Sequence, residues 1–339
     1  MNRQGPGSYR LGRRRTNAPA LLHNPGVSTT RIQGSRALRR GLAGGLTLAL
    51  LASAALGGEA EDAAREQKFC EAGNAQACTN LGDAYRSGRG VVVDLARAAA
   101  LYERGCNAGD SAACGNLGAC YEKGQGVAVD LARAFALYLQ ACDHGDATAC
   151  SNQGVFWEYG KTVKPAIDRA GALYKRACSA GDAGGCANLA RLLDVGKGMA
   201  ADPKRAVELY ERACEADLLE ACNSLGRLYE QGRGVDVDEF VAARLYMRAA
   251  RSDPRGMYNL GRFYERGRGP IPEKVERAAE LYERACDADV AEACFSLAER
   301  LARGGEALSD PLRARALFER SCELGQREGC ERVGRAPAP

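Results

Sequence analysis

Histidine, aromatic residues and long apolar runs are scarce in this sequence of 339 residues. It contains two His, His23 and His144, a single Trp, and 6% aromatic residues in all. Outside the N-terminal region His144 is the one histidine that could act as a general base, and no Ser is followed by Lys at the third position. Both observations argue against the common arrangements of catalytic residues in hydrolases. The low aromatic content, with abundant Ala, Leu and Arg, favours close-packed helices over a sheet protein.

Acidic residues are missing from the first part of the chain. Residues 1–57 carry nine Arg and no Asp or Glu, so the overall net charge of +4 leaves −5 for residues 58–339. An apolar run at 41–57 follows Arg36, Arg39 and Arg40, as in an export signal. The run is too short and too weakly flanked to favour a permanent membrane span. We therefore expect a basic extension and export signal over 1–57, a separate repeat domain over 58–339, and no nucleic-acid partner.

Cysteine is plentiful and regularly spaced from Cys70 onward. The cysteines occur as C-x7-C pairs that recur every 36 residues, namely Cys70/Cys78, Cys106/Cys114, Cys142/Cys150, Cys178/Cys186, Cys214/Cys222, Cys286/Cys294 and Cys322/Cys330. One expected pair is absent, and Ala250 and Met257 stand in its place after a deletion of one residue. Since residues that bond to each other are lost together, the pattern predicts one disulfide per repeat.

The alternative for these cysteines is zinc binding, and it fits less well. The C-x7-C spacing lacks the short separation of zinc ligands, so two pairs would have to meet at each site. Disulfides also agree with export, because they persist outside the reducing cytosol. Cys120 has no partner in the pattern, and we interpret it as a free thiol in an apolar or groove setting, with a reactive or intermolecular thiol as the alternative.

Each repeat has the pattern of two helices. Counting from the second cysteine of a pair, Leu81, Gly82 and Tyr85 take positions +3, +4 and +7, which share one helix face with the cysteine. A G-x-G turn ends this first helix, and the second helix carries the phrase A-L-Y-x-R-A-C. We expect N-caps at Asp94, Asp130, Asp202 and Asp310, followed in two cases by Pro203 and Pro311.

A fixed period of 36 residues predicts stacked units that contact their neighbours. The predicted fold is therefore all-α, a right-handed α-solenoid of about seven helix-turn-helix repeats and a partial C-terminal one. The stretch A-C-N-S-L-G-R-L-Y-E-Q-G-R-G-V at 221–235 resembles the Sel1-like repeat family, relatives of the tetratricopeptide repeats, and the resemblance covers 61–334. The cysteine pairs resemble the cysteine-rich branch of that family, which includes the Helicobacter cysteine-rich proteins.

The resemblance implies an exported bacterial protein, periplasmic or secreted, whose first helices line a concave groove. Positions +2, +5, +6 and +9 lie opposite the core face and are the expected groove positions. At +2 we expect a row of amides that suits an extended peptide backbone, or else bonds to its own scaffold: Asn80, Asn116, Asn152, Asn188 and Asn259. At +5, Arg191, Arg227 and Arg262 suit carboxylates, with a solvated charge row as the alternative. Phe156 and Tyr159 would form an apolar end of the groove or pack between helices.

The predicted function is that of an exported, disulfide-stapled scaffold that binds a protein or an extended, carboxylate-bearing peptide. Neither a metal nor a cofactor is expected. Two alternatives remain open. Members of the cysteine-rich branch are described as β-lactamases or penicillin-binding proteins, so the resemblance also implies a β-lactam hydrolase, although no catalytic residue is identified here. The other alternative is a structural scaffold within an envelope complex.

Overall fold

The computed structural model describes residues 58–303 and 310–335, and every regular element in them is an α-helix. A helical stretch over residues 58–71 comes first. The helices that follow it are α2 (Ala75–Ser87), α3 (Leu95–Asn107), α4 (Ser111–Lys123), α5 (Leu131–Asp143), α6 (Ala147–Tyr159), α7 (Ile167–Ser179), α8 (Ala183–Val195), α9 (Pro203–Glu215), α10 (Leu219–Gln231), α11 (Glu239–Ala249), α12 (Pro254–Arg266), α13 (Val275–Asp287), α14 (Ala291–Arg303), α15 (Pro311–Glu323) and α16 (Arg327–Val333). The predicted export signal at 1–57 lies outside the described residues.

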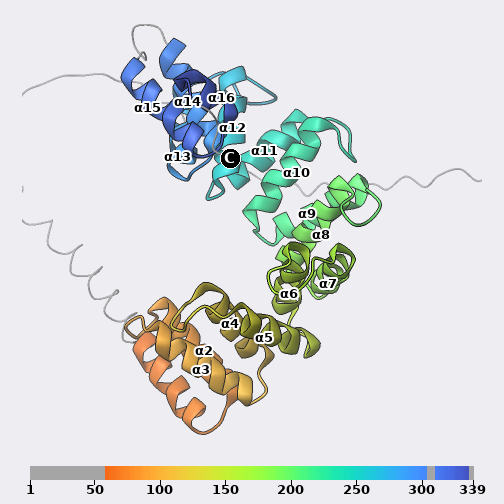
Figure 1. Ribbon diagram of the computed structural model, residues 1–339, viewed down its shortest axis with the longest axis vertical. Helices are drawn as coiled ribbons and strands as arrows, with labels where there is room; N and C mark the ends of the chain where they lie inside the picture. Colours follow the sequence, from red (N-terminus) through yellow and green to blue (C-terminus); the bar gives the residue numbers. More distant parts are fainter. Residues whose placement is uncertain (1–57, 304–309, 336–339) are drawn as a thin grey trace, which may run out of the picture. The chain divides into compact units, whose positions relative to one another are not determined.

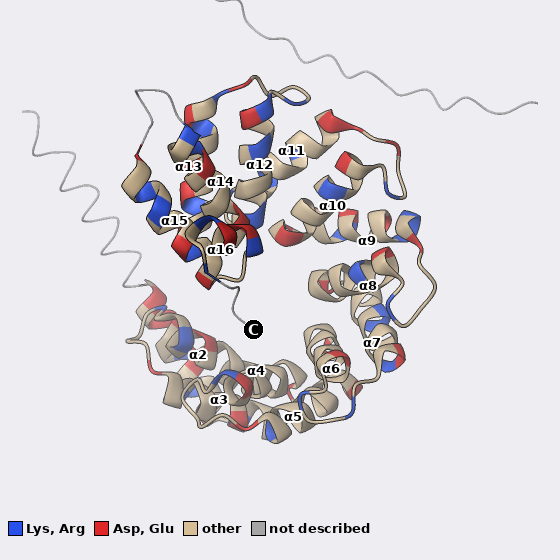
Figure 2. Cartoon of the chain, turned by 45° about the horizontal axis from the view of Figure 1, so that its top comes forward, with Lys and Arg blue, Asp and Glu red and all other residues tan. Residues whose placement is uncertain are grey.

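The helices form two layers of an α-solenoid, as the period predicts. Each even-numbered helix is the first helix of a repeat and packs against the odd-numbered second helix that follows it. First helices of successive repeats also contact one another, as α4 and α6 or α6 and α8 do. Figure 2 shows α4, α6 and α8 on one side of the stack and α5, α7 and α9 on the other. We call the even-numbered side the first-helix face.

Side-chain caps set the beginnings of the helices. The carboxylates of Asp94, Asp130, Asp202 and Asp310 each accept a hydrogen bond from a backbone N–H in the first turn of the second helix, which confirms the four predicted caps. Pro203 and Pro311 are the first residues of α9 and α15, where a missing N–H costs nothing. The first helices have caps that the sequence reading did not include, such as Asp146, which binds the N–H of Ala149.

Glycine at position +4 allows the two helices of a repeat to approach closely. A Cβ atom at Gly118 would lie 2.9 Å from Cε1 of Tyr138, the tyrosine of the A-L-Y phrase, and the rings of Tyr138 and its counterparts are fully buried. The second glycine of the G-x-G turn has another role. Gly126 adopts a φ of 75°, and a Cβ there would lie 2.1 Å from the carbonyl oxygen of Leu95 in the preceding repeat.

Seven disulfides join the cysteine pairs, and each connects the last turn of a second helix to the first turn of the next repeat. Their Cα atoms are 4.4–4.7 Å apart. Because the sulfurs are bonded to each other, the zinc alternative is wrong. All seven predicted pairings are confirmed: Cys70–Cys78, Cys106–Cys114, Cys142–Cys150, Cys178–Cys186, Cys214–Cys222, Cys286–Cys294 and Cys322–Cys330.

The second cysteine of every pair is buried on the core face of a first helix, as its place at position zero predicts. Each of these residues is 3% exposed or less: Cys78, Cys114, Cys150, Cys186, Cys222, Cys294 and Cys330. The sulfurs of Cys78 and Cys150 also lie 3.7 Å from the carbonyl oxygens of Cys70 and Cys142. These are packing contacts and not hydrogen bonds, because a disulfide-bonded sulfur has no proton to donate. The cysteines therefore serve the scaffold, and none of the seven presents a reactive thiol.

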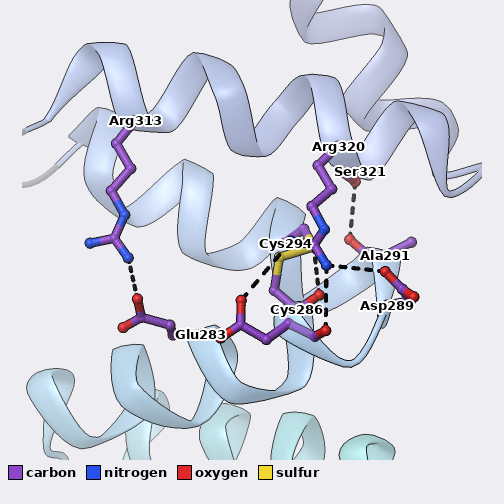
Figure 3. Close-up of a disulfide and its surroundings, with 9 residues drawn as sticks. Glu283, Cys286, Asp289, Ala291, Cys294, Arg313, Arg320 and Ser321 are labelled. Atoms are coloured by element: carbon purple, nitrogen blue, oxygen red, sulfur yellow. Dashed lines mark hydrogen bonds and ion pairs between the residues drawn. A yellow bond between two sulfur atoms is a disulfide. The ribbon is translucent and has the colours of Figure 1, made fainter.

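Arginine side chains reinforce the stapled junctions from the following repeat. Figure 3 shows the Cys286–Cys294 disulfide, where Arg320 of the next second helix reaches back to the carboxylate of Asp289 at 3.1 Å. Arg104 similarly donates to the carbonyl oxygen of Cys70 at 3.0 Å. Each disulfide thus lies at a point where two repeats are already in contact.

The junction without a disulfide is closed by apolar packing. Ala250 and Met257 are 8% and 7% exposed and belong to one hydrophobic cluster with Phe263 and Leu260. Helix α11 has 11 residues where the other second helices have 13. The other turns of this kind contain a residue with positive φ, either Gly or, in two cases, Asp217 and Asp289 at 62°. The deletion before Met257 removes that residue, so this turn is shorter.

Candidate functional site

The register of the first helices decides which of their positions are accessible. Positions +3, +4 and +7 pack against the second helix of the same repeat. Positions +2, +5 and +9 form the outward stripe of the first-helix face, because they lie within about 60° of one another on a helix. On α4, α6 and α8 this stripe consists of Asn116, Ala119, Lys123, Asn152, Val155, Tyr159, Asn188, Arg191 and Val195. We call these nine residues the amide stripe.

Position +6 was wrongly assigned to the groove. Phe156 is fully buried, and its ring lies 5.8 Å from the rings of both Phe135 and Tyr138. Cys120, at the same position of the preceding repeat, is 3% exposed and is the free cysteine of the described residues. Burial raises the pKa of its thiol, which makes it a poor nucleophile. Position +6 therefore belongs to the packing of a first helix against the second helix of the preceding repeat, here α6 against α5.

The asparagines at +2 divide into two groups. Asn80 donates to Glu66 and accepts from Gln76, while Asn259 donates to Asn223 at 2.8 Å and accepts from Arg262. These two bond to their own scaffold, as one alternative held. Asn116, Asn152 and Asn188 are half-buried, and their side chains make no hydrogen bond with any residue in the ranges 58–303 and 310–335. The first helices of three successive repeats, α4, α6 and α8, thus carry amides whose donors and acceptors are unused within the described residues.

Arg191 faces a buried carboxylate of the preceding repeat. Its Nη1 and Nη2 donate to Oε1 and Oε2 of Glu158 at 2.9 and 2.6 Å, and Nζ of Lys197 reaches Oε1 at 3.0 Å. The hydroxyl of Tyr174 donates a further hydrogen bond of 2.9 Å to Glu158. Glu158 is 4% exposed, so these four contacts replace the water that the carboxylate gives up on burial.

The same arrangement recurs along the stack. An acidic residue occupies position +8 in five successive repeats, and we call these residues the carboxylate ladder: Glu122, Glu158, Asp194, Glu230 and Glu265. Four of the five carboxylates, all except that of Asp194, accept a hydrogen bond from the hydroxyl of a tyrosine in the same repeat. A base from the next repeat pairs with each of the five. The ladder therefore joins repeat to repeat beneath the amide stripe.

The other two predicted arginines take part in this ladder. Arg227 lies 3.7 Å from Asp194, which also pairs with Arg233 at 2.8 Å. Arg262 lies 3.2 Å from Glu230, which also pairs with Arg268. Each of the three junctions thus combines a carboxylate of the preceding repeat with two cations, and at the third junction Arg268 also pairs with Glu239. The side chains of Arg191, Arg227 and Arg262 keep 35%, 49% and 26% of their surface exposed, so all three are still accessible.

The cations control the charge state of the buried acids. Burial alone raises the pKa of Glu158, but the hydrogen bonds from Arg191, Lys197 and Tyr174 outweigh it and lower the pKa below its ordinary value. Glu230 behaves in the same way, since contacts with Tyr246, Arg262 and Arg268 outweigh its burial. Both residues are therefore anionic at neutral pH. The ladder was not predicted from the sequence, although the repeats carry acidic residues at position +8 and basic residues at position +11.

Apolar side chains are exposed beside these charges. Tyr159 and Val195, both at +9, are 60% and 59% exposed. Nζ of Lys197 lies 5.6 Å from the centre of the Tyr159 ring, within the range of a cation–π contact. Trp157, at +7, packs instead against Phe135 and Arg169. The amide stripe thus combines free amides, two exposed apolar side chains and accessible cations.

The rest of the described chain provides little for catalysis or metal binding. His144 lies in an exposed turn, with Nδ1 2.8 Å from the carbonyl oxygen of Gln140. Within residues 58–303 and 310–335, no group of three or more His, Cys, Asp or Glu is arranged to hold a metal ion. None of the helices in these ranges is long and apolar enough to cross a membrane.

The fold and the stripe define a class of protein, a disulfide-stapled α-solenoid scaffold. The Sel1 repeat model matches seven successive segments, 75–110, 111–146, 147–182, 183–218, 219–253, 254–290 and 291–326. The chain therefore belongs to the Sel1 repeat family. No curated protein matches the sequence. The seven disulfides indicate an oxidising environment outside the cytoplasm.

Solved structures of other repeat proteins are similar to this one. The protective antigen c5321 of uropathogenic Escherichia coli, with an SLR fold, is 27% identical over 80% of this chain, with a TM-score of 0.62. The match spans 58% of the length of that protein. A Sel1 repeat protein from Oxalobacter formigenes is 29% identical over 64% of this chain and 89% of its own, with a TM-score of 0.59. Helicobacter pylori cysteine rich protein B is 29% identical over 39% of this chain and 96% of its own, with a TM-score of 0.33.

Proposed function

We propose that this protein binds an extended segment of another protein along the amide stripe of α4, α6 and α8. The observation that carries the proposal is the set of three half-buried amides, Asn116, Asn152 and Asn188, which have no hydrogen-bond partner within the described residues. A carboxamide both donates and accepts, as a peptide group does. A row of amides one repeat apart therefore suits a peptide main chain that crosses successive helices.

Neighbouring side chains supply the contacts that a peptide's own side chains require. Tyr159 and Val195 offer exposed apolar surface, and aromatic anchors contribute strongly at protein interfaces. Arg191 lies one turn beyond Asn188 on α8. The bound segment would therefore present an apolar side chain near Tyr159 and a carboxylate near Arg191.

The carboxylate ladder leaves a cationic surplus for such a ligand. At the Glu158 junction, one buried carboxylate faces both Arg191 and Lys197, so one positive charge is left uncompensated. The junction at Asp194 has the same composition, whereas at the Glu230 junction Arg268 also pairs with Glu239 and no surplus remains. The surplus at Glu158 and Asp194 supports a carboxylate-bearing ligand whose acidic end extends from Arg191 to Arg227.

The proposal places this interaction in the bacterial periplasm or outside the cell. The disulfides support that compartment, and the basic and apolar pattern of residues 1–57 supports export. In this reading the segment 1–57 is removed, and the oxidised repeat domain, residues 58–339, binds its partner.

A random peptide library displayed on phage tests the proposal. Selection on the oxidised repeat domain should enrich peptides with an apolar residue near a carboxylate. Replacing Asn116, Asn152 and Asn188 together by Ala should weaken the selected peptides about tenfold or more, since each lost pair costs about 1 kcal/mol. The matched control replaces Asn80, at the same helix position but bonded to Glu66 and Gln76, and should leave affinity unchanged. Equal affinity of the triple variant and the wild type would overturn the proposal.

A further inference from the structure

Helix α11, the second helix of its repeat, presents a face unlike those of the second helices in the flanking repeats. Phe240, Arg244 and Met247 occupy three exposed positions on this helix. In the flanking repeats the same positions are Lys204, Glu208 and Glu211 on α9, and Glu276, Glu280 and Glu283 on α13. Helix α11 therefore has two large apolar side chains and a cation where the adjacent helices have charged residues, mostly acidic.

This face is exposed and carries no carboxylate of its own. Phe240 and Met247 are 62% and 43% exposed, and Val237 in the preceding turn is 62% exposed. Arg244 makes no ion pair with any residue of the described part of the chain. Phe, Met and Arg are the residue types enriched in protein interfaces, whereas Glu and Lys are depleted. The composition thus indicates a surface that another protein covers.

The complementary surface is present on α13, the second helix of the following repeat. On α13, Glu276, Glu280 and Glu283 form an exposed acidic row at the corresponding positions. Glu280 pairs with Arg277 of its own helix at 2.5 Å and Glu283 pairs with Arg313, both at exposed positions, where such pairs contribute about 0–1 kcal/mol and exchange readily. Glu276 has no ion pair within the described residues. The second helices of two successive repeats therefore carry complementary rows, one basic and apolar on α11 and one acidic on α13.

We propose that two copies of this chain associate through these helices, with α11 of one copy packed against α13 of the other. A two-fold axis between the helices places both contacts at once, since each copy brings one row of each kind. Arg244 would then face the acidic row of the partner while Phe240 and Met247 lose contact with water. This association uses the second-helix side of the stack and leaves the amide stripe free.

Charge favours a second copy over an anionic membrane as the occupant. The face of α11 lies between Glu208 and Glu211 of α9 and the acidic row of α13, and a negatively charged lipid surface would be repelled by these carboxylates. The same carboxylates attract the exposed guanidinium of a partner's α11.

Sedimentation equilibrium of the oxidised repeat domain tests the proposal. We expect a reversible dimer that dissociates with added salt. Arg244→Glu should raise the dissociation constant about tenfold or more, and Phe240→Glu should do the same. Lys204→Glu, at the position on α9 that matches Phe240, is the control and should leave the dimer intact. A monomeric wild type at all concentrations, whether or not it binds anionic vesicles, would overturn the proposal.

A charge exchange separates this contact from general effects on folding. The variant Glu280→Arg/Glu283→Arg should also be monomeric alone, because its α13 repels Arg244 of a partner. Mixed with Arg244→Glu, it should form a heterodimer, in which one of the two symmetric contacts gains reversed but matching charges. Circular dichroism of each variant should match that of the wild type. Folded variants that fail to form the heterodimer would count against the proposed pairing.

Discussion

Arg191 holds the buried carboxylate of Glu158 through two hydrogen bonds of 2.9 and 2.6 Å, although the two residues belong to different repeats. This pair shows why the arginines at +5 have two roles. They tie one repeat to the next, and they leave part of their surface on the first-helix face. A substitution at Arg191 would therefore change stability as well as binding, so the asparagines are the cleaner test of the proposed peptide site.

Replacing Glu158 by Gln should destabilise the oxidised domain by about 2 kcal/mol, because two cations would lose their charged partner. The estimate is at the lower end for a buried pair, since the side chains of Arg191 and Lys197 are 35% and 45% exposed. Urea unfolding, monitored by hydrogen exchange in α6 and α8, would measure the change in the free energy of unfolding. Glu208→Gln, an exposed residue of α9, serves as the control, and an equal effect of both variants would contradict the structural role of the ladder.

The effect of Glu158→Gln should depend on pH. The pKa of Glu158 is lower in the folded protein than in the unfolded chain, so its stabilising contribution is present above the unfolded pKa of about 4.3. As pH falls through the folded pKa, the native carboxylate becomes protonated and the contribution is lost. Stability curves of the wild type and the variant should therefore be separate at pH 7 and converge below about pH 4. A constant difference across this range would show that charge is not the cause.

Asp146 should show the opposite dependence on pH. Burial raises the pKa of this N-cap carboxylate above its ordinary value, and nearby Asp182 and Asp110 raise it further. A raised pKa means that the charged form is disfavoured in the folded state, so stability increases as pH falls through that pKa toward the lower pKa of the unfolded chain. Asp146→Asn keeps a good N-cap without the charge and should match or exceed the wild-type stability at pH 7, by up to about 1 kcal/mol. Its advantage should disappear near pH 4, whereas destabilisation at neutral pH would contradict this account.

The architecture could be predicted from the sequence because it depends on contacts that repeat. Cys178 and Cys186 recur with their whole pattern every 36 residues, and paired loss at Ala250 and Met257 indicated which cysteines bond. Position +6 could not be assigned from the helical period alone. Phe156 lies away from the core face of its own helix, but Phe135 and Tyr138 of α5, the second helix of the preceding repeat, pack against it. A single amphipathic period describes packing within one repeat and omits the packing between repeats.

The candidate site was predictable in part for the same reason. The amides at +2 were identified by their register, but only the structure separates Asn116, which is unpaired in the described chain, from Asn259, which bonds to Asn223. Arg191 was predicted as a groove residue without its partner, because Glu158 lies 33 residues earlier in the chain. Reading the repeats as columns, with acids at +8 beside bases at +5 and +11, would have revealed this pairing.

Gly154→Ala should destabilise the protein by about 1–3 kcal/mol, despite the better helix propensity of alanine. An added Cβ would lie 2.6 Å from Cε1 of Tyr174, a fully buried ring whose hydroxyl is bonded to Glu158. Gly115→Ala is the matched control on α4, because the nearest atom to its Cβ is 3.6 Å away. The control should stabilise by about 0.5–1 kcal/mol. Thermal unfolding of both variants would measure the difference, and destabilisation by the control alone would contradict the packing described here.

Reduction should loosen every stapled junction and spare the one between α11 and α12. Each disulfide closes a loop of nine residues, worth about 2.6 kcal/mol by the chain-entropy model. The Ala250–Met257 junction has no such bond and depends on the packing of Met257 with Leu260 and Phe263, which a reductant does not change. Hydrogen exchange with and without dithiothreitol should therefore show lost protection in the turn at Cys214–Cys222 and little change in the turn after Ala250. If protection fell equally in both turns, reduction would be unfolding the stack as a whole, and the local role assigned to each disulfide would be wrong.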